Sequence, residues 1–136
     1  MHISETSKAL TDFIYDRDPS NYLVGGVYHS DDPDKVPSES PSCTFAFLPA
    51  PYNKVLDSYY VDLTFWYSSP DFSKISQILK SIEEWAESWF DISDGQVIGK
   101  GQFVIRKSPL TGGKLNLSFI TVFGLLRATY FEDACR

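Results

Sequence analysis

Apolar residues recur along this chain with two different periods, and each period predicts a different kind of element. In residues 59 to 67, "YYVDLTFWY", every second residue is apolar and fits one face of a strand. Its inward set is Val61, Leu63, Phe65 and Tyr67, and its outward set is Tyr60, Asp62, Thr64 and Trp66. Alternation of this kind predicts a β-strand with one core face and one mixed face.

After Asp71 or Ser73, either of which can cap a helix, the period changes to three and four. The apolar positions are then Ile75, Ile78, Leu79, Ile82, Trp85, Ala86 and Trp89. This stripe predicts an amphipathic helix that lies on a sheet and ends at Asp94-Gly95. Glu83, Glu84 and Glu87 fall on its solvated side.

The remaining segments predict one more helix and four more strands. Ser4 or Thr6 can cap a first helix that runs to about Arg17, and the cluster from Asp18 to Asn21 ends it. Short strands are expected at 24–29 and 44–48, separated by a loop that contains three prolines. Residues 102–107 and 114–123 are expected to form a hairpin joined by "SPLTGG", and Gly124 to form a bulge that redirects the tail toward Tyr130 and Phe131.

These elements predict an α+β fold in a single domain that spans residues 1–136. The expected order is helix, three strands, helix, two strands, with two helices packed on one mixed, mostly antiparallel sheet. A chain of 136 residues is long enough to bury about two-thirds of the surface that it exposes when unfolded.

Charge is distributed unevenly along the chain, whose net charge is -6. Residues 1–94 hold 16 acids and six bases, whereas residues 95–131 hold five bases and no acid. The overall acidity disfavours a general nucleic-acid binder, and the split predicts two surfaces of opposite sign unless the lysines are placed by chance. No apolar run approaches the roughly 20 residues of a membrane span, and the start lacks a signal peptide, so we expect a soluble protein made without export.

The stretch "VGGVYHSDDP" gathers the side chains most suggestive of catalysis. His29, Ser30 and Asp31 are consecutive, but adjacent residues of an extended chain point to opposite sides and cannot form a catalytic relay. A metal site of His29 with Asp31, Asp32 and Asp34 lacks any known ligand motif. The glycine pairs match no phosphate-binding loop, and the paired carboxylates are expected to be solvated. The sequence therefore predicts no enzyme, no cofactor and no metal.

Cysteines and aromatic residues are the last compositional features. Cys43 and Cys135 are interpreted as free thiols, with a bridge between them as the alternative. The aromatic surplus consists of Trp66, Trp89, Tyr59, Tyr60 and Tyr67, and either a protein interface or a large aromatic core explains it.

The order of elements and several phrases resemble the tail terminator, or tail completion, proteins of long-tailed bacteriophages. The phrases are "GGVYHSDDP", "CTFAF", "YYVDLTFWYSSPD" and "DFSKISQILKSIEEW", and the resemblance covers most of the chain. It implies a small α/β subunit of a hexameric ring at the head-proximal end of the tail tube. Such a ring ends tube growth and contacts the tube protein and the neck proteins. It is not associated with a membrane. It carries no cofactor or active site.

The same resemblance implies assembly in the host bacterial cytoplasm, a final place in the virion at the tail-neck junction, and DNA that passes through the lumen without specific binding. The long hairpin "RKSPLTGGKLNLSF" and the aromatic density depart from the family pattern. They leave open another neck role, as a connector or stopper protein. A monomeric acidic immunity-type module that binds a toxin is the alternative from a different class.

A closed ring needs two unlike patches on each subunit, because one patch must meet a different patch on the next copy. We expect Arg106, Lys107 and Lys114 to supply a basic patch that meets acids of a neighbour or a tail partner. Asp31, Asp32 and Trp66 complete the expected interface residues.

Overall fold

The computed structural model describes residues 3–30, 32, 35–49, 57–93, 97–106 and 110–133. Its helices are α1 (Ile3–Asp16) and α2 (Phe72–Trp85), with a 3-10 turn at Ser69–Asp71. Its strands are β1 (Val27–His29), β2 (Ser42–Pro49), β3 (Asp57–Tyr67), β4 (Trp89–Ser93), β5 (Val97–Ile105), β6 (Leu110–Lys114) and β7 (Leu117–Asp133). The predicted α+β class is confirmed, with two strands, β4 and β6, that the sequence pattern did not separate.

All seven strands belong to one sheet, in the order β1-β2-β3-β7-β5-β4. Every pair is antiparallel except β1 with β2, which is parallel. β6 pairs with the first part of β7 and β5 with its second part. β5 and β6 therefore act as one interrupted strand that forms a long hairpin with β7.

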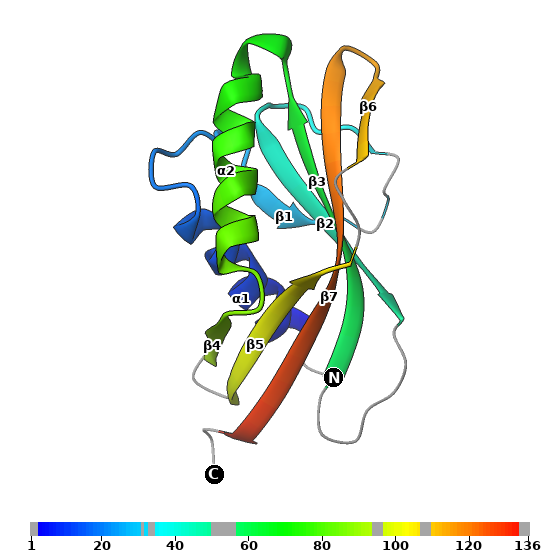
Figure 1. Ribbon diagram of the computed structural model, residues 1–136. Helices are drawn as coiled ribbons and strands as arrows, with labels where there is room; N and C mark the ends of the chain where they lie inside the picture. Colours follow the sequence, from blue (N-terminus) through cyan, green and yellow to red (C-terminus); the bar gives the residue numbers. More distant parts are fainter. Residues whose placement is uncertain are drawn as a thin grey trace.

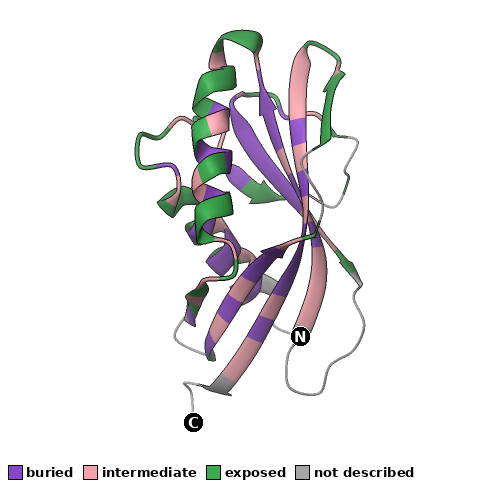
Figure 2. Ribbon diagram, in the orientation of Figure 1, coloured by how far each residue is buried: buried purple, intermediate pink, exposed green. Residues whose placement is uncertain are grey.

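Both helices lie on the same side of the sheet, so the molecule has two layers (Figure 1). The core lies between these layers, and Figure 2 shows that the buried residues concentrate there. The predicted alternation in β3 is confirmed, because Val61, Leu63 and Phe65 are fully buried. These three side chains pack against the buried face of α2, which consists of Ile75, Ile78, Leu79 and Ile82. At about 1.5–3 kcal/mol for each large side chain, this contact is the main source of stability before chain entropy is subtracted.

Asp18 ends α1 in the way that its cluster predicts. Its buried carboxylate accepts hydrogen bonds from the backbone N–H groups of Tyr22, at 2.8 Å, and Leu23, at 2.9 Å. The expected N-terminal caps are wrong, because α1 begins at Ile3 and already includes Ser4 and Thr6. The hydroxyl of Thr6 instead bonds that of Tyr130 and so ties α1 to β7.

The end of α2 differs from the prediction. Asp71 occupies the expected N-cap position, but the helix stops at Trp85, well before Asp94-Gly95, which lie outside the described residues. Ala86 leaves the helical region with ψ 144°, and Glu87 has a positive φ of 70°. Trp89 then opens β4, so the stripe from Trp85 to Trp89 is not one helix face.

The predicted hairpin is correct in kind but wrong in its turn. Gly112 and Gly113 lie within β6, and the turn falls at Leu115-Asn116, where Leu115 has φ 54°. Gly124 is in register with both neighbouring strands, and the sheet irregularity is between Ile98 and Gly99. The strand expected at 24–29 begins only at Val27, because Val24 and Gly25 form a turn that the Gly26 N–H closes by donating to the Leu23 carbonyl at 3.0 Å.

Gly124 is required because the Phe103 ring covers it. A Cβ on Gly124 would lie 2.1 Å from two atoms of that fully buried ring. We expect Gly124→Ala to lower the free energy of unfolding by about 1–3 kcal/mol, measured by urea denaturation. Gly113→Ala is the matched control, since its Cβ would meet nothing closer than 3.7 Å. Equal stability of the two variants would contradict this packing.

Candidate subunit interface

The sheet surface that faces away from the helices is the most distinctive surface of the molecule. We call it the open face. Side chains alternate along a strand, so the register of β2, β3 and β7 places one set of residues there. The set includes Thr44, Ala46, Tyr60, Asp62, Thr64, Trp66, Phe119, Thr121 and Phe123. Two aromatic pairs cross the strands, Trp66 with Phe119 at 5.4 Å and Tyr60 with Phe123 at 5.1 Å between ring centroids.

A hollow of about 250 Å³ opens on this face. Its floor comes from β2, β3 and β7, and its borders come from the residue after β1 and from the end of β6. The lining residues are Ser30, Thr44, Phe45, Ala46, Asp62, Thr64, Trp66, Lys114, Phe119 and Thr121. The hollow therefore brings together two of the predicted interface residues, Trp66 and Lys114.

The polar groups on the floor of the hollow bond to one another. The indole Nε1–H of Trp66 donates to Thr44 Oγ1 at 3.0 Å, and the hydroxyls of Thr64 and Thr121 are 3.0 Å apart. These bonds satisfy the buried indole and hold the threonine side chains in place. Trp66 itself is only 3% exposed, so it shapes the hollow and offers little contact area of its own.

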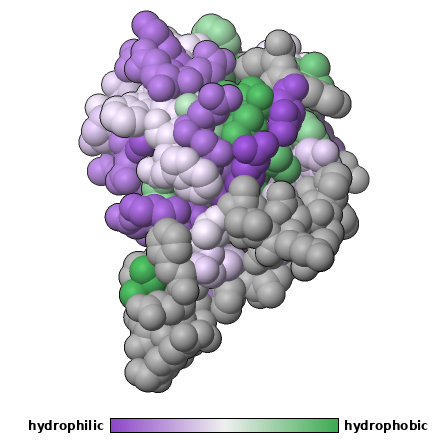
Figure 3. All heavy atoms as spheres, turned by 60° about the horizontal axis from the view of Figure 1, so that its bottom comes forward, coloured by the Kyte–Doolittle hydropathy of each residue, from purple (hydrophilic) through white to green (hydrophobic). Residues whose placement is uncertain are grey.

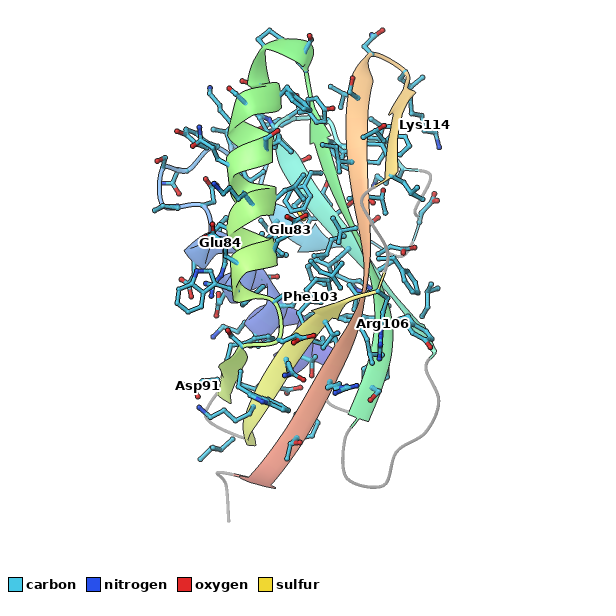
Figure 4. The ribbon with its side chains drawn as sticks, in the orientation of Figure 1. Glu83, Glu84, Asp91, Phe103, Arg106 and Lys114 are labelled. Atoms are coloured by element: carbon cyan, nitrogen blue, oxygen red, sulfur yellow. The ribbon has the colours of Figure 1, made fainter. Side chains whose placement is uncertain are left out.

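The other predicted interface residues are spread along the same side of the sheet. Arg106 lies between β5 and β6, where its backbone N–H donates to the carbonyl of Phe123 at 2.9 Å and its side chain is exposed. Figure 4 shows Arg106 and Lys114 on the side of the sheet away from α2. Asp32 is exposed beside the hollow, and its carbonyl accepts a hydrogen bond from the Ser30 hydroxyl at 3.0 Å. Asp31 and Lys107 lie outside the described residues.

Both sides of the sheet carry charges of both signs. Asp62 and Asp91 lie on the open-face side, and exposed Lys8, Lys74 and Lys80 belong to the helices, so the expected surfaces of opposite sign are not separated by the sheet. The bases between residues 95 and 131 that the structure describes are Lys100, Arg106, Lys114 and Arg127, and all lie on the open-face side. Lys100 pairs there with Asp91 across β4 and β5. The acidic residues Glu83, Glu84 and Glu87 instead belong to α2 and its C-terminal end, in the helical layer. Figure 3 shows hydrophobic groups reaching the surface between hydrophilic ones.

The candidate catalytic stretch does not converge. His29 packs against the rings of Phe45 and Phe47, at 5.7 and 5.3 Å between centroids, whereas Ser30 lines the hollow. The two side chains point to opposite sides of the sheet, as predicted for consecutive residues of a strand. Cys43 is fully buried, and burial raises the pKa of its thiol, which keeps it protonated.

Sequence reasoning missed the hollow as a unit. Its threonines come from three strands, and the cross-strand contact between Trp66 and Phe119 depends on a pairing of residues 53 positions apart. Alternation in residues 59–67 showed that Thr64 and Trp66 share a face, which is the one local signal for the site. Leu115, at the tip of the hairpin, was not singled out.

Thr44 is expected to be necessary for a stable hollow. Thr44→Val keeps the shape of the side chain but leaves the Trp66 indole N–H buried without this acceptor. We expect a loss of about 1–3 kcal/mol in the free energy of unfolding by urea denaturation. Thr44→Ser retains the hydroxyl and should recover most of that loss. If valine and serine cost the same, the hydrogen bond does not stabilise the site.

Neither the described residues nor the comparisons with known proteins assign a ligand or a family to this site. No group of three or more His, Cys, Asp or Glu residues that could hold a metal ion occurs among the described residues. Within the same part of the chain, no helix is long and apolar enough to cross a membrane. No protein-family model matches the chain, and no curated protein sequence matches it.

Proposed function

We propose that this protein is a subunit of the ring that closes the head-proximal end of a bacteriophage tail and joins it to the neck. The observation that carries the proposal is a sheet that α1 and α2 cover on one face only, as far as the described residues show, beside a hairpin that carries Lys114. The resemblance of the element order and phrases to tail terminator proteins supplies the biological role.

The open face supports assembly because it displays aromatic and apolar groups that neither helix covers. Aromatic side chains are enriched in protein interfaces. The face holds a concave feature, the hollow, and the hairpin of β6 and β7 offers a convex one. Two unlike features on one chain allow a head-to-tail contact that repeats from copy to copy until a ring closes.

Charge favours the same kind of contact. Exposed Arg106 is placed to meet acidic groups of a neighbouring subunit or of a tail partner, which would steer approach and fix register. The net charge of -6 would also let DNA traverse the ring without adhering to it.

Reversal of the basic patch tests the contact between subunits. We expect Arg106→Glu combined with Lys107→Glu to lower the yield of rings at moderate salt, because like charges would then meet across the interface. Light scattering would measure the yield as mass at a multiple of 15.4 kDa. The control is Lys8→Glu with Lys80→Glu, the same charge change at two exposed lysines of the helices. Unchanged assembly of the Arg106/Lys107 variant would reject this contact.

The biological role is tested on phage particles that lack the protein. A tail terminator leaves tails of irregular excess length when it is absent, whereas a connector or stopper leaves tails of normal length that fail to join heads. Electron microscopy of such particles separates the two roles.

A toxin-binding immunity module is the second candidate, and one feature favours it. The half-exposed Trp85 follows Glu83 and Glu84 at the end of α2, and the guanidinium of Arg17 lies over its ring at 5.0 Å. This surface combines two acids and a base around an aromatic ring. A module of this class stays monomeric at high concentration, so the same light-scattering measurement distinguishes it from a ring.

A further inference from the structure

Leu115 is held in a conformation that costs free energy in the isolated subunit. It occupies the turn between β6 and β7 with φ 54°, in the left-handed region that favours glycine and asparagine. Its side chain is also 84% exposed, and Leu110 at the other end of β6 is 63% exposed. Strain and apolar exposure at the same hairpin tip indicate that this side chain contacts something outside the subunit.

The hollow on the open face has the shape and chemistry to receive such a side chain. Its volume of about 250 Å³ is several times the roughly 30 Å³ that a water molecule occupies in the liquid, which leaves room for the four carbons of leucine. The hydroxyls of Thr64 and Thr121 bond each other, and Thr44 accepts from the Trp66 indole. An apolar side chain can therefore cover the floor without removing these hydrogen bonds, and it would pack against Ala46, Trp66 and Phe119.

Charge at the border of the hollow is mixed. Lys114 and Asp62 line the hollow of the same chain, and Lys114 immediately precedes Leu115 on the hairpin. The contact between copies therefore depends on the fit of the leucine side chain and not on charge.

We propose that Leu115 of one copy inserts into the hollow of a second copy. The occupant of the hollow is thus a second copy of this chain, and the tip and hollow are the two unlike patches of the contact. This inference rests on the proposed ring and names the residues that hold it together.

Leu115→Asn tests the tip while removing the strain. Asparagine tolerates the left-handed conformation, so the single subunit should be as stable as the wild type or more stable in urea denaturation. Loss of the buried leucine should nevertheless raise the dissociation constant of each contact about tenfold to hundredfold, measured by sedimentation velocity over a concentration series. Val24→Asn is the control, since Val24 is also an exposed apolar residue, at 68%, but lies in the turn before β1. Association of L115N at wild-type strength overturns the proposal.

Ala46→Leu tests the hollow without changing the tip. The larger side chain fills the hollow of its own chain, where the space already exists. It should weaken association as much as L115N does, and the double variant should be no weaker than either single variant, because both remove the same contact. If A46L leaves association unchanged, or if the two losses add in full, Leu115 docks elsewhere and the proposal fails.

The outcomes separate this inference from the proposed function. A ring that forms normally in both L115N and A46L overturns the docking but leaves the ring itself intact. A wild-type chain that remains single at every concentration overturns docking between copies. Tail length in particles without the protein decides the terminator role in either case.

Discussion

The architecture depends on one imbalance: the sheet has two faces, and the helices of the described residues cover only one of them. α1 and α2 both pack on the same side, where fully buried Leu63 and Phe65 meet the apolar stripe of α2. The opposite face has to carry side chains that tolerate water and can also be covered. The mixture of threonine, aspartate and aromatic rings around Trp66 meets that requirement.

β7 is the strand that contributes to both faces of the sheet and to the hairpin. It pairs along one edge with β3 and along the other with β6 and then β5, so a single strand runs through both halves of the sheet. Its glycine, Gly124, lets the Phe103 ring lie against the backbone on the helical side. On the open side, Phe119 contacts Trp66 and its ring lies over Gly112. The same strand therefore supports the core, the floor of the hollow and the hairpin.

The fold class and the main core positions could be predicted because they follow from the local spacing of apolar residues. β3 and the first three turns of α2 follow strict periods of two and of three to four, and both are confirmed. The end of α2 could not be predicted, because no glycine or proline marks it within the described residues and Trp89 continues the helical spacing by coincidence. Gly112-Gly113 resembled a turn, yet both lie in a paired strand, where Gly112 leaves space for the Phe119 ring.

The site was less predictable than the fold for a physical reason. Trp66 and Lys114 were selected for different properties, an aromatic surplus and a basic run, and only the non-local pairing of β3 with β7 and of β7 with β6 places them in one hollow. A leucine at positive φ cannot be predicted from a sequence, because the left-handed region favours glycine and asparagine over leucine. The expected basic patch depends partly on Lys107, which lies outside the described residues.

The central claim is that copies meet through the open face, and footprinting by hydroxyl radicals at rising protein concentration tests it most directly. The account predicts that oxidation of Leu115, Phe119 and Phe123 falls as the particles form, while Phe72 and Trp85 in the helical layer stay accessible. Protection of the helical layer with an unchanged open face would contradict it.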